Sequence, residues 1–248
     1  MKACGCYSLL PQAFIVGDPM KHKLSSCLSV VVAVLCFFVA TCKAQERDSP
    51  TTIVETGYYI IARKVVVAVV AANPFEDQFA SHPGIRITLR ASDGSIITTR
   101  EKSSAGIPPK SKIAFCADVY FDERPATVDI RPTSAGYERT VYRASDFRPF
   151  ELLNLRMREG ESRVQVTGEI KNPYPAQTGA WITFLFRNAK GKIVSGASKW
   201  VSEVLAGDPT PFEFSIPKED VSPEATSIEK IVFDHNNELS SWQKLLRR

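Results

Sequence analysis

The residues that could act in catalysis or bind a metal are few in this 248-residue chain. After residue 44, histidine occurs only at His82 and His235, and cysteine only at Cys116. His82 lies in the loop-like segment 80–84, where a histidine side chain is usually solvated. His235 lies in segment 234–237, which lacks the ordered oxygen ligands and the distal glutamate of a calcium loop. We therefore expect neither a metal site nor a catalytic histidine.

The spacings that identify common catalytic sites are also missing from the sequence. It contains no Gly-x-Ser-x-Gly elbow, phosphate-binding loop, His-Glu-x-x-His motif or dinucleotide fingerprint. Its carboxylates are scattered, so no glycosidase pair stands out. Cys116 follows the apolar Phe115 in an alternating stretch, which favours a packed thiol over a nucleophile. We predict no catalytic residues, no cofactor, and a protein that is not an enzyme.

Two tryptophans offer a different kind of site. Trp181 precedes an alternating stretch and Trp200 lies within another one. Exposed together, they could form a platform for a carbohydrate, although half-buried tryptophans are common in β-sandwiches.

The first 44 residues form a segment that predicts export. Lys21 and Lys23 precede an apolar run over residues 24–40, and Ala44 ends a short stretch of small residues before a polar segment. This pattern is typical of a signal peptide cleaved after Ala44. Two alternatives stay open: residues 24–40 could remain as a membrane anchor, or Cys42 could be lipidated. The lipobox-like sequence before Cys42 departs from the bacterial pattern at its preceding threonine. Translation could start at residue 1 or residue 20.

Much of the chain's charge and most of its cysteines lie in this leader. Four lysines and one aspartate give residues 1–44 a net charge of +3, out of +4 for the whole chain. The remaining chain is nearly neutral, so its charge is no argument for nucleic-acid binding. Cleavage would leave Cys116 as the only cysteine and would exclude an intramolecular disulfide.

The rest of the chain repeats itself at a distance of about 100 residues. Asn-Pro-aromatic triplets begin at Asn73 and at Asn172, 99 positions apart. Apolar stretches recur around them in the same order: 65–72 and 164–171, 85–89 and 182–186, 96–97 and 193–194, 113–115 and 212–214, 128–130 and 231–233. A repeat of this length indicates duplicated domains rather than a solenoid.

The hydrophobic pattern within each repeat has a period of two. Such alternation is typical of antiparallel strands with one buried and one solvated face. Proline cannot continue a central strand, so Asn73 and Asn172 should mark strand ends. Gly94 and Gly191 should occupy turns with positive φ.

We therefore predict an all-β fold of two tandem antiparallel immunoglobulin-like β-sandwich domains after an N-terminal signal helix. The first domain spans residues 51–134 and the second spans 147–237. Residues 135–146 form a linker, and 238–248 form a C-terminal tail.

One strand differs between the two repeats in a way that concerns binding. Its second face is polar in the second repeat, with Gln165, Thr167 and Glu169. The matching positions of the first repeat are Val66, Ala68 and Val70. Either a neighbouring segment or the other domain covers this apolar face, or it is an exposed patch for a partner. On the second interpretation, lysine at positions 66 and 70 would leave the fold intact and abolish binding.

The order of these features resembles the FxLYD domain. The shared pattern is a valine-rich strand, Asn-Pro, an alternating strand, a glycine turn and a later Phe-x-Phe strand. The family's namesake stretch would fall on residues 184–188 and 87–91, where Arg-Asn and Arg-Ala replace its aromatic-acidic ending. The resemblance implies an immunoglobulin-like sandwich in a secreted or envelope protein, and it implies no catalytic chemistry.

These observations favour an exported, non-enzymatic binding or structural module of the cell envelope, which acts through contacts with an envelope or secreted protein. We expect it to be secreted, periplasmic or on the cell surface, with no nucleic-acid partner and with membrane contact only through the N-terminal segment. One alternative is a secreted hydrolase or metal-dependent enzyme with a site between the domains. A second alternative is a membrane-tethered, stress-related sandwich protein.

Overall fold

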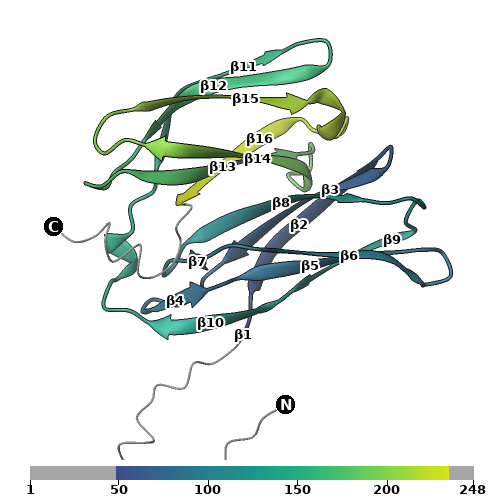
Figure 1. The fold of residues 1–248 in the computed structure, drawn as a ribbon, viewed down its shortest axis with the longest axis horizontal. Coiled ribbons are helices and arrows are strands. Elements are labelled where there is room, and N and C mark those ends of the chain that lie inside the picture. Colours follow the sequence, from purple (N-terminus) through teal and green to yellow (C-terminus); the bar gives the residue numbers. More distant parts are fainter. Residues whose placement is uncertain (1–48, 235–248) are drawn as a thin grey trace, which may run out of the picture. The chain divides into compact units, whose positions relative to one another are not determined.

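Antiparallel strands form most of the protein in the computed structural model, which describes residues 49–234 (Figure 1). The predicted leader with its expected cleavage after Ala44, Cys42, His235 and the predicted tail 238–248 lie outside the described residues. All of the described residues belong to one compact unit. They include no helix that is long and apolar enough to span a membrane.

The first repeat is a sandwich of two three-stranded sheets with a further sheet at one end. One sheet has the order β2-β3-β8 and the other has the order β6-β5-β9. Their bounds are β2 (Thr52–Ile61), β3 (Lys64–Ala72), β5 (Gly84–Arg90), β6 (Ile96–Ser103), β8 (Lys112–Tyr120) and β9 (Thr127–Pro132).

The second repeat has the same topology. Its sheets have the orders β11-β12-β15 and β14-β13-β16. Their bounds are β11 (Glu151–Glu159), β12 (Arg163–Lys171), β13 (Thr178–Arg187), β14 (Ile193–Val204), β15 (Thr210–Pro217) and β16 (Ser227–Asp234). Each of these six strands therefore corresponds to one strand of the first repeat's two three-stranded sheets and has the corresponding neighbours. The predicted all-β fold of antiparallel sandwiches is confirmed for the described residues.

The first repeat carries an additional sheet that the second lacks among the described residues. Its order is β1-β10-β4-β7, with β1 (Ser49–Pro50), β4 (Gln78–Ser81), β7 (Gly106–Ile107) and β10 (Ser134–Arg139). The prediction of a linker over 135–146 is wrong in its first part. Ala135 and Tyr137 are buried in the core of the first repeat, so β10 belongs to that sandwich. A single 3-10 turn, η1 (Ala144–Asp146), lies in the remainder.

The alternation of apolar residues determines which faces meet inside each sandwich. In the first repeat, Val65, Val67 and Val69 of β3 face Ile85 and Ile87 of β5 in one cluster of buried side chains. In the second, the corresponding residues of β12 and β13 form another cluster: Val164, Val166, Ile182, Phe184 and Phe186. The inner core of each sandwich is therefore built from alternate residues of its strands, while β3 is apolar on its second face as well.

The Asn-Pro corners are built identically in the two repeats. Asn73 and Asn172 directly follow β3 and β12, and both side chains are buried. The Asn73 amide donates to the carbonyl oxygens of Gln78 at 2.7 Å and Ile107 at 3.0 Å, and its Oδ1 accepts from the Phe75 amide at 3.1 Å. Asn172 makes the matching three bonds. The buried amide thus satisfies three backbone groups of the corner.

The glycine turns also follow the prediction. Gly94 has φ of 86° and Gly191 has φ of 75°, in the hairpins between β5 and β6 and between β13 and β14. Both values lie in the left-handed region that glycine adopts without steric cost.

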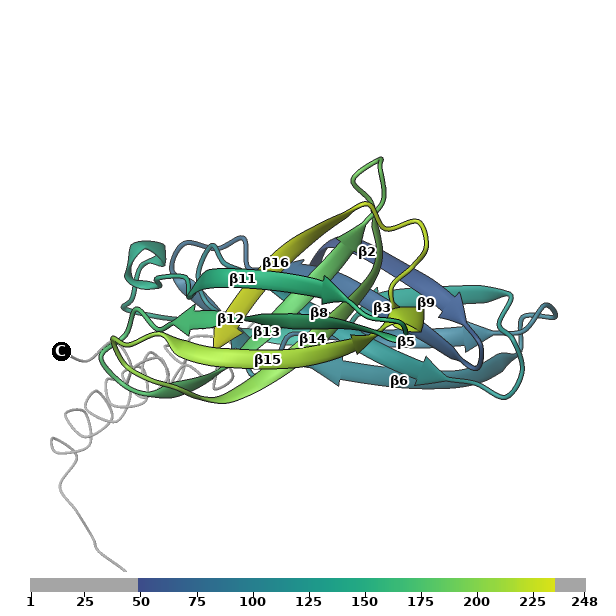
Figure 2. The same ribbon diagram turned by 90° about the horizontal axis from the view of Figure 1, so that it is seen from above.

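Four of the sheets lie in successive layers (Figures 1 and 2). The two inner layers are β2-β3-β8 of the first repeat and β14-β13-β16 of the second, because β14 packs against β2, β3 and β8. The outer layers are β6-β5-β9 and β11-β12-β15. The sheets of the two repeats therefore meet face to face.

Candidate binding groove between the repeats

The apolar second face of β3 lies in the contact between the repeats. Val66, Ala68 and Val70 are 1%, 0% and 4% exposed. Ala68 and Val70 pack with Leu185 of β13 and Ile193 of β14 in a third cluster of buried residues. The interpretation of this face as an exposed partner patch is therefore wrong, because the second repeat covers it. The alternative of coverage by the other domain is correct.

Two glycines allow the inner sheets to approach closely. A Cβ atom on Gly57 of β2 would lie 2.0 Å from the backbone oxygen of Ile193. A Cβ atom on Gly196 of β14 would lie 2.7 Å from the Cys116 sulfur and 2.9 Å from the Ala68 Cβ. These distances are shorter than non-bonded carbon contacts allow, so only glycine fits at either position.

An arginine at one side of this contact joins the two repeats. Arg187 of β13 forms a bidentate pair with Glu55 of β2, with Nη1–Oε1 and Nη2–Oε2 distances of 2.6 and 2.8 Å, and also pairs with Glu229 of β16. The Arg187 side chain is 19% exposed. Its hydrogen bonds lower the pKa of the Glu55 carboxyl below its ordinary value, despite the opposing effect of desolvation.

A lysine at another part of the contact makes a second link. The Lys64 ammonium lies 2.7 Å from Asp220 of the 3-10 turn η2 (Lys218–Asp220) and 3.2 Å from Asp118 of β8. Desolvation disfavours this ammonium, but the hydrogen bonds and charges of the two carboxylates outweigh it and raise the pKa of Lys64. Lys64 thus stays charged at neutral pH and compensates both carboxylates in part.

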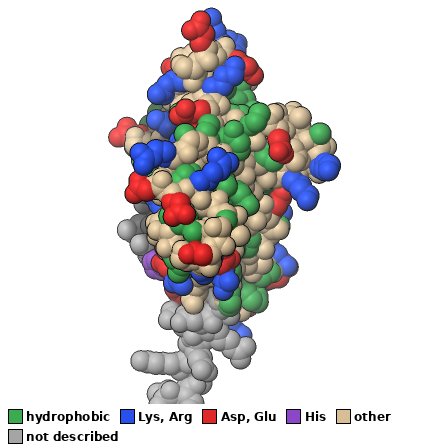
Figure 3. All heavy atoms as spheres, turned by 90° about the vertical axis from the view of Figure 1, so that its right-hand side faces the viewer, with side chains coloured by type: hydrophobic (Ala, Val, Ile, Leu, Met, Phe, Trp, Pro, Cys, Tyr) green, Lys and Arg blue, Asp and Glu red, His purple; other side chains and the backbone are tan. Residues whose placement is uncertain are grey.

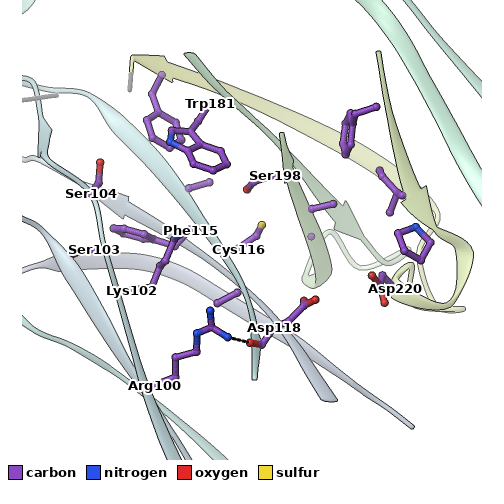
Figure 4. Close-up of a pocket in the computed structure, with 18 of the residues that line it drawn as sticks. Arg100, Lys102, Ser103, Ser104, Phe115, Cys116, Asp118, Trp181, Ser198 and Asp220 are labelled. Carbon is purple, nitrogen blue, oxygen red and sulfur yellow. Dashed lines mark hydrogen bonds between the residues drawn. The ribbon is translucent and has the colours of Figure 1, made fainter. Parts of the chain in front are cut away.

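An open groove with a volume of 820 Å³ lies beside these links (Figure 4). Residues of β6, β8, β14 and β15 line it. Each of these strands is the edge of its sheet, and the four edges come from four different sheets. An edge strand presents backbone N–H and C=O groups that lack a strand partner. The groove is therefore a place where four sheet edges meet, and we regard it as the candidate functional site.

Two basic side chains define one wall of the groove. Arg100 and Lys102 lie on the face of β6 that is directed toward β8, because they pair with the core residues Ile87 and Ile85. Arg100 donates to the backbone oxygen of Asp118 at 2.5 Å. The Lys102 ammonium lies 5.5 Å from the ring centroid of Trp181, a favourable cation–π geometry.

The charged groups in and beside the groove sum to +1, with Arg100, Lys102 and Lys64 against two carboxylates. The two carboxylates, Asp118 and Asp220, share Lys64. The ion pairs formed between described residues leave out Arg100 and Lys102. An anionic group would therefore be attracted to the β6 wall.

Cys116 lies at the base of the groove as a packed thiol, as its position beside Phe115 predicts. It packs against the residues of the inter-repeat cluster. Burial raises the pKa of the Cys116 thiol to about 12, so the thiolate is scarce at neutral pH. Since the thiolate is the reactive form, this environment does not favour a nucleophile.

The other residues singled out in the sequence lie in separate places. His82 is exposed in the tight turn between β4 and β5, with φ of 51°, and does not line the groove. Trp181 and Trp200 are cross-strand neighbours with ring centroids 5.7 Å apart, and only Trp181 lines the groove. In residues 49–234, no group of three or more His, Cys, Asp or Glu side chains could hold a metal.

A second open groove, of 670 Å³, lies on the single sheet β11-β12-β15, with Arg156, Glu169 and Glu213 among its lining residues. The exposed large apolar side chains come from many strands and loops: Val54, Tyr58, Phe75, Ile96, Tyr120, Val141, Met157 and Leu205. On the face shown in Figure 3, basic and acidic side chains are interspersed.

Comparison with known proteins adds no further assignment. No family model matches the sequence. No curated protein matches it either.

Proposed function

We propose that this protein is an exported, non-enzymatic binding module of the cell envelope, and that it holds a protein partner in the groove between its two repeats. The observation that carries the proposal is the meeting of four sheet edges around an 820 Å³ groove, one wall of which carries the basic side chains Arg100 and Lys102. Open strand edges recognise other polypeptides by backbone hydrogen bonding, and pockets beside them supply specificity.

Two features of the sequence support the exported setting. The basic, apolar and small-residue segments up to Ala44 have the order of a signal peptide. The likeness to the FxLYD domain also favours a secreted or envelope location. Intact mass and membrane fractionation from the native host would distinguish a chain that starts at Gln45 from one lipidated at Cys42 or retaining residues 24–40.

Site-specific photo-crosslinking would test the groove as the partner site. A photoreactive amino acid is placed at Ser103, an exposed residue of β6 that lines the groove. The matched control is Ile96, which is exposed on the same strand but does not line the groove. We expect a discrete crosslinked protein in the native host from position 103 and none from position 96. Identical products from both positions, or none from position 103, would contradict the proposal.

A further inference from the structure

The backbone of β8 is directed into the groove at alternate residues. The pairing of β3 with β8 is bracketed by two hydrogen bonds, from the Phe121 amide to the Arg63 oxygen at 2.9 Å and from the Asn73 amide to the Ser111 oxygen at 3.0 Å. In an antiparallel ladder, the residues that bond across the pair alternate with residues whose N–H and C=O point away. Counting inward from both ends, the outward-pointing residues include Ala114, Cys116 and Asp118, all of which line the groove.

Arg100 occupies one of these outward-pointing groups. Its guanidinium donates to the Asp118 carbonyl oxygen, which has no strand partner on that side (Figure 4). The side chain of a neighbouring sheet thus satisfies a backbone acceptor that an incoming strand would use.

We infer that the groove receives an extended segment of the partner, which adds to β8 as a fourth strand and alternates acidic with apolar residues. This inference rests on the proposed function and specifies the ligand of the same site. The outward-pointing stretch from Ala114 to Asp118 suits a segment of about five residues, or about 17 Å.

The alternation follows from the two walls that flank β8. Side chains of an added strand point alternately to opposite faces of the sheet. On the face toward β6, they meet Arg100 and Lys102. On the face toward the second repeat, they meet the aromatic rings of Trp181 and Phe233. Carboxylates suit the first wall, and apolar side chains suit the second.

Binding of such a segment exchanges partners at Arg100. A backbone N–H of the added strand takes over the Asp118 carbonyl oxygen, and the released guanidinium pairs with a carboxylate of the ligand. This exchange keeps both the acceptor and the charge satisfied, and charge-assisted pairs of this kind are the stronger ones.

Fluorescence anisotropy with defined peptides tests the inference on the protein purified from its native host. The probe is a fluorescein-labelled heptapeptide of alternating Glu and Val, and the matched peptide has Lys in place of Glu. We expect saturable binding of the acidic probe that weakens as salt rises, and at least about tenfold weaker binding of the basic peptide.

Backbone methylation of the probe separates strand addition from simple charge attraction. Every second N–H of an added strand points toward β8, so N-methylation at one set of alternate positions should abolish binding and at the other set should preserve it. Equal effects at both sets would overturn strand addition.

Protein variants locate the contact. Arg100→Glu and Lys102→Glu should each weaken binding about tenfold. The matched control Arg131→Glu changes an exposed arginine on β9, at the opposite edge of the same sheet, and should bind as the unaltered protein does. Circular dichroism of each variant confirms that it is folded. An unchanged affinity in folded Arg100→Glu would overturn the inference.

Two further outcomes distinguish this inference from the proposed function. Binding of a polygalacturonate oligomer without binding of the acidic peptide would overturn it in favour of an anionic polysaccharide. Failure of every probe, while Ser103 still crosslinks to a host protein, would overturn the acidic strand and leave the protein-binding function standing. Loss of the Ser103 crosslink as well would contradict both the acidic-strand inference and the proposed protein-binding function.

Discussion

At the scale of single residues, the charged side chains between the two repeats stabilise the contact between them. Glu55 is held by both nitrogens of the Arg187 fork and also accepts the Ile193 amide at 3.3 Å. Since both partners belong to the second repeat, the ionised form of Glu55 stabilises the contact between the repeats.

The stability of the protein should therefore fall at acid pH, in part through Glu55. Its folded-state pKa lies below the ordinary value of 4.5, so its contribution is present above that pH and is lost as pH falls through the folded pKa. Glu55→Gln should lower the free energy of unfolding at pH 7, and the gap to the unaltered protein should close below pH 4.5. Urea unfolding at several pH values measures this difference. The control Glu159→Gln breaks only an exposed pair with Lys218 and should have a small effect throughout. A gap that is independent of pH would contradict this role.

At the scale of elements, the distance between neighbouring backbones determines which glycines of the strands can be replaced by a larger residue. Gly57 of β2 lies directly against the backbone of β14, whereas Gly136 of β10 has only an ordinary neighbour, the Ser81 Cβ at 3.8 Å from a Cβ built on it. Neither glycine has a positive φ. The two positions therefore differ in available space and not in backbone conformation.

Replacement by alanine should separate the two positions. Gly57→Ala should destabilise the protein by about 1–3 kcal/mol, because β2 and β14 must part to admit the methyl group. Gly136→Ala should be neutral or slightly stabilising, since alanine restricts the unfolded chain more than glycine does. Chemical denaturation of the two variants compares them. Equal destabilisation of both would show that the close approach at Gly57 does not matter.

The strands and corners could be predicted from the sequence because they depend on local patterns. Alternation places the inner cores, proline ends β3 and β12, and glycine marks the hairpin turns. The strand register could not be predicted from the sequence in the same way. Matching the apolar stretches of the sequence pairs Phe115 with Phe214. In the structure Phe115 lies opposite Val69, and the corresponding residue of the second repeat is Phe212, which lies opposite Gly168. A slip of two residues keeps the same face buried, so periodicity cannot detect it.

The candidate site was not predictable in the same way. The apolar residues Val66, Ala68 and Val70 predict that this face of β3 is buried. They do not predict which residues of the second repeat bury it. The signal there is Leu185, an apolar residue at an outward position of β13 where the first repeat has Thr88. Arg100 and Lys102 carry no motif, because only the packing of the sheets makes them neighbours of β8.

At the scale of the whole molecule, Cys116 reports whether the repeats stay together. Its sulfur lies between β8 and β14, and its thiol has a pKa of about 12. Although Cys116 is only partly buried, its reaction with a thiol reagent at neutral pH should therefore be slow while the inner sheets stay together.

Alkylation of Cys116 by iodoacetamide should be slow in the unaltered protein and faster when the contact is weakened. Val70→Lys places an ammonium among the side chains of the inter-repeat cluster, so it should accelerate modification by at least about tenfold. The control Val141→Lys alters a residue that is 89% exposed and should not change the rate. Peptide mass spectrometry quantifies the modified Cys116 separately from other cysteines. Equal rates in the two variants would mean that the repeats do not hold the thiol closed.

The polar outer face of β12 limits how many sheets can stack. Gln165, Thr167 and Glu169 stand where the first repeat offers its apolar contact face, and Gln165 is exposed. A further copy of the chain that presented its β13 sheet there would bury these polar groups instead of Ala68 and Val70. The two repeats therefore have the same topology but different outer faces: β3 is apolar where β12 is polar. The polar face resembles that of the terminal units that cap a repeat array. The apolar face of β3 is covered within the chain, and the corresponding face of β12 offers a further copy no matching apolar surface.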